Sequence, residues 1–270
     1  AWVAILATPQ KRGQAVGTLT SGIVSGILLS RFISGAIADI AGWRAVYLTA
    51  ACMMLLMAGV VWKVMPSPSK QSQPQKSTYL SLLKSVFQLY ITEPQLRKRG
   101  ILALLIFAAF SMLWTTMVMP LTALSLSHTQ AGMFGLAGLA GVLAASRAGK
   151  WADLGWAQRT TGLALALLAL SWLPIAYVET SLLWLLVGVI ALDFAVQAVH
   201  VSNQSLIIAA RPAAASRLVG AYMCFYSLGS AAGAIVATQL YSHWGWQAVC
   251  LAGAAVSACA FLVWSGSRRS

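Results

Sequence analysis

Residues 17–38 read GTLTSGIVSGILLSRFISGAIA, an apolar stretch without proline that contains one full charge, Arg31. An α-helix rises about 1.5 Å per residue, so a helix of this length crosses a hydrocarbon layer of roughly 30 Å. Glycines and serines leave one surface poor in side chains, on which another helix can approach closely. We therefore predict a membrane-spanning helix over 16–38 that packs against a second helix instead of facing lipid. Its glycines are Gly17, Gly22, Gly26 and Gly35.

The surroundings of this helix recur near the other end of the chain, at a constant offset of 203 residues. No gap is needed between residue 9 and residue 48. A single offset that keeps the landmarks in register predicts two structural repeats of the same hand. The offset pairs Gly17 with Gly220, Gly26 with Gly229, Gly42 with Gly245 and Trp43 with Trp246.

The composition predicts a polytopic membrane protein and excludes a soluble core. The chain of 270 residues is 59% hydrophobic and 9% charged, has eleven Trp, and has a mean hydropathy of +0.78. We expect Pro120 and Pro174 to kink their helices. The apolar runs predict spans over 16–38, 43–65, 100–123, 131–149, 160–178, 182–208, 217–241 and 245–265.

The formal net charge of +13 follows the predicted topology. All basic residues except Arg31 and Arg44 fall at alternate ends of the spans, and we expect Arg97, Lys98 and Arg99 to anchor the cytoplasmic start of one span. By the positive-inside rule both termini of this chain are cytoplasmic, as an even number of spans requires. The basic residues are therefore explained by the membrane, and we do not expect a nucleic-acid partner.

A polar, proline-rich segment, residues 66–76, separates the second span from the third. After it, apolar residues recur at helical spacing from Tyr79 with Lys84 on the other side, which predicts a helix along the cytoplasmic surface. Residues 92–95 break this helix. We therefore divide the chain into the remainder of an N-terminal bundle (1–65), a cytoplasmic linker with an amphipathic helix (66–99) and a six-helix C-terminal bundle (100–270).

The repeat also makes a prediction about completeness. Partners for residues 100–203 would lie before residue 1 at the same offset. We therefore expect a 6 + 6 architecture that lacks roughly 100 residues, helices one to three and most of helix four.

Four polar residues occupy one face of the span predicted over 182–208. Asp193, Gln197, His200 and Gln204 stand at i, i+4, i+7 and i+11, which places them in one stripe, with Asn203 at its edge. Polar groups at membrane depth are costly unless they line water or a substrate cavity. We therefore predict that this stripe faces a central cavity and forms a substrate and proton pathway.

Two interpretations of Asp193 remain open. An isolated carboxylate near mid-span is costly or takes up a proton. Asp193 either binds and releases protons, with His200 as a relay, or it pairs with Arg31 or with donors of another helix and only fixes packing. Arg31 correspondingly binds an anionic substrate group or neutralises Asp193. Candidate cavity-lining aromatic residues are Trp114, Tyr222 and Tyr226.

These features resemble the major facilitator superfamily, and within it the bacterial drug- and sugar-efflux branch with twelve helices. In that branch helix five carries an antiporter motif, G-x8-G-x3-G-P-x2-G-G. Serines replace two of its glycines here, and Arg31 stands in place of its proline. The corresponding residues are Gly17, Gly26, Ser30, Arg31, Ser34 and Gly35. The resemblance covers the whole chain, from the end of helix four to helix twelve.

A cytoplasmic motif of the family, G-x3-D-R/K-x-G-R/K-R/K, is present in degenerate form. Gly149, Asp153 and Gly155 match it, and Arg159 follows. The resemblance implies that this loop, residues 149–159, is a conformational latch. The alternative is an ordinary charged loop.

The resemblance implies a monomeric secondary transporter of the bacterial inner membrane, which exports a small organic compound of drug or sugar type by proton-coupled antiport. It implies no cofactor and no metal. Alternating access needs both bundles, so we expect this chain alone to transport nothing. One alternative is a non-functional membrane remnant of a disrupted gene. Another is an intramembrane enzyme that uses Asp193 and His200 as acid and base. No HExxH motif or Ser-His-Asp arrangement accompanies these two residues, so we do not predict an enzyme.

Overall fold

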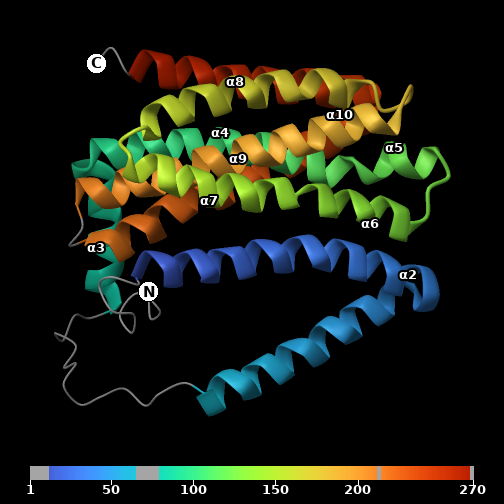
Figure 1. The fold of residues 1–270 in the computed structure, drawn as a ribbon, viewed down its shortest axis with the longest axis horizontal. Helices are drawn as coiled ribbons and strands as arrows, with labels where there is room; N and C mark the ends of the chain where they lie inside the picture. Colours follow the sequence, from blue (N-terminus) through green and yellow to red (C-terminus); the bar gives the residue numbers. More distant parts are fainter. Residues whose placement is uncertain (1–11, 65–78, 212–213, 268–270) are drawn as a thin grey trace.

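The computed structural model describes residues 12–64, 79–211 and 214–267, and within these ranges the chain is helical without a β-strand. Five of the described segments are long and apolar enough to cross a membrane, which confirms the predicted all-α polytopic membrane fold. The long helices run along one common axis, and α3 crosses their ends (Figure 1). The helices are α2 (Arg12–Val64), α3 (Tyr79–Thr92), α4 (Pro94–Thr116), α5 (Val118–Ala123), α6 (His128–Ala137), α7 (Leu139–Asp153), α8 (Ala157–Ala176), α9 (Leu182–Ala210) and α10 (Ala215–Ser267).

Helices α2 and α10 are each two spans joined at a glycine. Each has 53 residues, about 80 Å at 1.5 Å per residue, which is more than twice the hydrocarbon thickness. The backbone turns at Gly42 (φ 78°, ψ 170°) and at Gly245 (φ 74°, ψ −168°), so both ribbons fold back as hairpins (Figure 1). Positive φ favours glycine, because it lacks Cβ. The offset of 203 residues therefore relates two turns with nearly the same backbone conformation.

The span predicted over 100–123 begins earlier and is divided. Helix α3 ends at Thr92 and α4 begins at Pro94, so the predicted break between them is confirmed. Proline suits the first position of a helix, because its N–H would have no partner there. The chain divides again at Met117, between α4 and α5. Pro120 lacks the N–H that would bond to the carbonyl of Thr116, which explains the break at this point.

Two other spans also differ from their predicted ranges. Gly138 separates α6 from α7 inside the range predicted as 131–149. Helix α8 ends at Ala176, two residues before the predicted end, and Pro174 lies in its last turn. The remaining predicted spans lie within α2, α9 and α10, except that residue 65 lies outside the described ranges.

Two glycines of α10 bring its backbone close to that of α4. A Cβ atom at Gly229 would lie 2.2 Å from the carbonyl oxygen of Leu104, and one at Gly233 would lie 2.3 Å from that of Ala108. No other residue fits there without moving a backbone. The second arm of α10 packs on α8, where Trp172 donates a hydrogen bond to Ser257 Oγ (3.1 Å).

The glycines of α2 behave differently from those of α10. No heavy atom of another described element lies within 4 Å of a Cβ built at Gly22 or Gly26. The close helix contact predicted along this surface is therefore wrong at these two positions. Among the α2 glycines whose burial the structure describes, Gly35 is the buried one. The paired tryptophans differ too, since Trp43 is 61% exposed and Trp246 is 5% exposed. Trp246 is buried because it packs against α8 and donates to the carbonyl of Ile175 (3.1 Å).

Helix α2 contacts the second half of the chain at the start of α6. Asp39 Oδ2 accepts hydrogen bonds from the backbone N–H (2.8 Å) and the hydroxyl (2.6 Å) of Thr129. Ser127 and Gln130 form a capping box at the same helix start. A carboxylate is favourable at this helix end, where the backbone N–H groups lack helical partners.

Helix α3 is the predicted helix after the linker; residues 65–78 of that linker lie outside the described ranges. Leu89 and Tyr90 pack against α10, and the Tyr90 hydroxyl donates to the carbonyl of Ala221 (2.9 Å). Burial raises the pKa of the Tyr90 phenol above its ordinary value. Lys84 and Phe87 are exposed. Phe87 therefore lies on an outward apolar face and does not share the buried face of the helix.

Replacement of Gly229 by alanine should lower the thermal unfolding midpoint of the protein in detergent, measured by tryptophan fluorescence. The methyl group would meet the backbone of Leu104, and overpacking of this kind costs about 1–3 kcal/mol. The matched control is Gly220→Ala in the same helix, where a Cβ meets no atom within 4 Å. Equal unfolding midpoints for the two variants would show that the α4–α10 backbone contact does not determine the thermal stability of the protein.

Candidate functional site

Helix α9 places Asp193 in the interior of the bundle. The residue is 3% exposed, and its Oδ1 accepts a hydrogen bond from Trp114 Nε1 of α4 at 3.0 Å. Helix α9 is held at its start by Ser181, whose side chain accepts a hydrogen bond from the Leu183 N–H. An indole N–H is only a donor, and a carboxylate is a strong acceptor, so the contact suits both groups. Asp193 therefore has a donor from another helix, as the interpretation that it fixes packing requires.

Gln197 lies one turn further along α9 and faces α7. A Cβ atom at Gly141 would lie 3.0 Å from Gln197 Cγ and 3.3 Å from the carbonyl oxygen of Asp193. Gly141 thus allows the α7 backbone to approach α9 beside the polar stripe. The side chain of Gln197 is half-buried.

His200 makes a second set of polar contacts, one with α10 and one within α9. Its Nδ1 lies 3.1 Å from the hydroxyl of Tyr222, and its Nε2 lies 3.3 Å from Gln204 Nε2. An amide nitrogen donates, so with this amide orientation the imidazole accepts at Nε2 and carries its proton on Nδ1, toward Tyr222. Phe107 packs edge-on against the imidazole at 5.0 Å, and Tyr226 contacts Phe107 at 4.0 Å between ring centroids.

Sequence reasoning missed a buried pair beside this cluster. Arg99 is 4% exposed and donates from Nη1 to Asn203 Oδ1 (3.2 Å), and Asn203 is fully buried. The prediction that Arg99 is a surface anchor is therefore wrong, although Arg97 in the same turn is exposed. Helical spacing could have indicated this burial. Arg99 lies three positions after Leu96, which places both residues on the same face of the helix, and Leu96 is buried.

Three of the four predicted stripe residues thus face three different helices, and Gln204 contacts His200 within α9. Asp193 contacts α4, Gln197 lies against α7, and His200 contacts α10. Of the predicted aromatic residues, Trp114 and Tyr222 are buried and Tyr226 is half-buried. The arrangement offers one buried carboxylate, one imidazole and a phenol within a single bundle, which are groups that can bind or pass protons.

Comparison with known proteins identifies the family. The model of the Major Facilitator Superfamily matches residues 1–210 and again residues 100–269. The chain belongs to the major facilitator superfamily. This membership confirms the resemblance inferred from the glycine motif, and the helical membrane fold agrees with it.

Two curated members of this superfamily are similar along most of the chain. YgaY of Escherichia coli strain K12, named as an uncharacterized transporter, is 43% identical over 264 residues, which cover 97% of this chain and 66% of YgaY. MdtG of Escherichia coli O17:K52:H18, named as a multidrug resistance protein, is 28% identical over 267 residues, 91% of this chain and 61% of MdtG. The chain therefore spans less than two thirds of the length of these relatives.

The helix-five motif of the superfamily falls on α2, and the structure describes part of it. Ser30 donates from its hydroxyl to the carbonyl of Ile27 (2.8 Å), within its own helix. The structure does not describe the side chain of Arg31 or the surroundings of Gly17. It therefore does not test a pairing of Arg31 with Asp193. The role of Arg31 stays a prediction.

The loop predicted as a latch, residues 149–159, is a tight helix–helix turn. Gly155 has a φ of 78°, the Gly155 N–H donates to Ala152 O (3.0 Å) and the Trp156 N–H donates to Trp151 O (2.8 Å). These two bonds form a Schellman motif, which favours glycine at this position. Arg159 is exposed, and the side chain of Asp153 lies outside the described features. A conformational role for the loop stays a prediction.

Replacement of Trp114 by phenylalanine should lower the unfolding midpoint, because Asp193 would lose a buried donor. A buried acceptor left short of a partner costs about 1–3 kcal/mol. The matched control is Trp184→Phe in α9, since Trp184 is exposed on the outside of the bundle. Thermal unfolding in detergent measures both variants, and an effect of Trp184→Phe as large as that of Trp114→Phe would argue against the importance of the hydrogen bond.

Proposed function

We propose that the whole protein is a secondary active transporter that exports a small organic compound across the bacterial inner membrane in exchange for protons. Support comes from the superfamily membership and from relatives named as a transporter and as a multidrug resistance protein. The observation that carries the proposal is Asp193, a buried carboxylate in the middle of a membrane-spanning helix. Ionisable groups at this depth are retained where they bind ions, protons or substrate.

Asp193 differs from the other acidic residues of the chain by its position. The sequence has five acidic residues, and the other four lie near helix ends, at Asp39, Glu93, Asp153 and Glu179. A carboxylate at a helix end serves capping or ion pairing at little cost. Asp193 instead occupies the bundle interior, so the proton-coupling role is assigned to it, with Trp114 as the donor that fixes its orientation.

His200 is proposed as the second group of the proton pathway. It lies seven residues from Asp193 on α9, roughly 10 Å along the helix axis. Gln197 stands between them, and Tyr222 and Gln204 contact the imidazole. These side chains provide successive donors and acceptors along one helix, which a proton or a polar substrate group requires in a medium without bulk water.

The proposed mechanism needs two units that move against one another. We assign α2 to the remainder of the first bundle (1–65), residues 66–99 to the connecting linker with α3, and residues 100–270 to the second bundle. The two units meet at Asp39 and Thr129, where a carboxylate of one caps a helix of the other. We place both termini of the chain in the cytoplasm, in accord with the distribution of basic residues. We take the functional unit to be a monomer, as the family resemblance implies.

Replacement of Asp193 by asparagine tests the coupling role. Asparagine keeps the acceptor for Trp114 but does not titrate, so gradient-driven efflux of ethidium should fall to background in cells that express the whole protein with this change. Exchange of the substrate without a gradient should persist. Glu179→Gln removes an exposed carboxylate and is the matched control, expected to retain efflux. Full proton-driven efflux by Asp193→Asn would contradict the assignment.

A further inference from the structure

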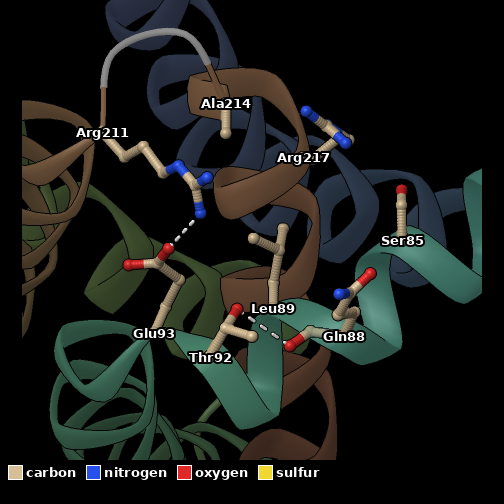
Figure 2. A pocket seen from close by; sticks show the side chains of 8 residues that line it. All are labelled: Ser85, Gln88, Leu89, Thr92, Glu93, Arg211, Ala214 and Arg217. Atoms are coloured by element: carbon tan, nitrogen blue, oxygen red, sulfur yellow. Dashed lines mark hydrogen bonds and ion pairs between the residues drawn. The ribbon is translucent and has the colours of Figure 1, made fainter.

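A pocket of about 360 Å³ lies at the end of the bundle where α3 crosses the other helices (Figure 2). Side chains of α3 form one wall, and the end of α9 with the start of α10 forms the other. Its volume falls in the range of small-ligand sites. The polar lining residues are Ser85, Gln88, Thr92, Glu93, Arg211 and Arg217.

The charges of this pocket do not balance. The carboxylate of Glu93 pairs with Arg211, and Figure 2 shows this contact across the pocket. Arg217 makes no hydrogen bond or ion pair with any of the residues that the structure describes. The lining therefore has a formal charge of +1, and Arg217 is the cation without a carboxylate partner there.

The remaining polar groups of the pocket favour an acceptor-rich ligand. A guanidinium has five N–H donors, so Arg211 retains donors beyond its contact with Glu93. The Gln88 side chain offers an amide, whereas the Thr92 hydroxyl donates to the backbone oxygen of Gln88 (3.0 Å). Arginine recognises planar or tetrahedral oxyanions through paired N–H groups, and phosphate matches this geometry.

The location of α3 brings this pocket to the depth of lipid headgroups. Leu89 is buried on one side of the helix, whereas Phe87 is 67% exposed and Ile91 is 75% exposed on another. A helix that crosses the ends of membrane spans and presents large apolar side chains outward lies in the membrane interface. Basic pockets between membrane helices on the cytoplasmic side bind anionic lipid headgroups.

We propose that this pocket binds a phosphate group, carried by the headgroup of an anionic phospholipid or by a soluble phosphate ester. Arg217 provides the main contact, and Gln88 and Arg211 add donors. The pocket charge of +1 matches a phosphodiester monoanion, because a dianion would leave one charge uncompensated beside Glu93. This inference is independent of the transport proposal, since none of these residues belongs to the α9 stripe.

The test uses the full chain, purified and delipidated in a neutral detergent. Native mass spectrometry counts bound phosphatidylglycerol, with phosphatidylcholine as the zwitterionic comparison, and calorimetry measures the binding of glycerophosphoglycerol, a soluble phosphodiester monoanion. Arg217→Gln should weaken binding about tenfold, the effect of losing one charged hydrogen bond. Glu93→Gln should strengthen binding, because it removes the opposing carboxylate. Arg147→Gln removes an exposed arginine of α7 outside the pocket and should leave binding unchanged.

The outcomes separate the two sources of phosphate. Phosphatidylglycerol binding that depends on Arg217 supports a lipid site, and binding of glycerophosphoglycerol alone with the same dependence supports a soluble ligand. Equal losses in Arg217→Gln and Arg147→Gln would overturn the proposal, since they would indicate general attraction to a basic surface. A weaker affinity in Glu93→Gln, or the absence of saturable binding of either compound, would also overturn it.

Discussion

The close approach of the α4 and α10 backbones at Gly229 and Gly233 positions the rest of the polar interior. Helices in lipid gain no hydrophobic free energy from contact with one another, so small residues that permit close van der Waals packing decide where they meet. Phe107 lies one turn from Leu104 on α4, and Tyr226 lies one turn from Gly229 on α10. This contact therefore brings both rings together beside His200. A methyl group at Gly229 would push these rings apart.

The sequence predicts the spans and their turns well, because the relevant forces are local. Twenty apolar residues are enough to define a membrane helix, and a helical hairpin needs a residue that tolerates positive φ, which the offset of 203 locates at Gly42 and Gly245. The division of α4 from α5 near Pro120 is similarly local. The membrane class and the superfamily follow from features of this kind.

The partners of the polar groups are less predictable, because they depend on how the helices rotate and cross. Asp193, Gln197 and His200 lie on one stripe of α9, yet the structure places them against three different helices. The stripe itself was predictable, because successive residues of a helix are rotated by about 100°. That Trp114 and Tyr222 would be its partners was not predictable, because the sequence contains many other aromatic residues. Arg99 shows the same limit, since a basic residue at a helix start is a surface anchor or a buried donor according to its rotation.

Asp193 and His200 are linked through the helices that hold them. Trp114 belongs to α4 and Tyr222 to α10, and these two helices are fixed to one another by their glycine contact. Helix α9 is packed instead on α7 at Gly141 and on α8, where Gly188 lies against Ile175. A shift of α9 relative to α4 and to the first arm of α10 would therefore alter both hydrogen bonds at once. Both groups of the stripe would then respond to a single movement, as the proposed coupling of protons to alternating access requires.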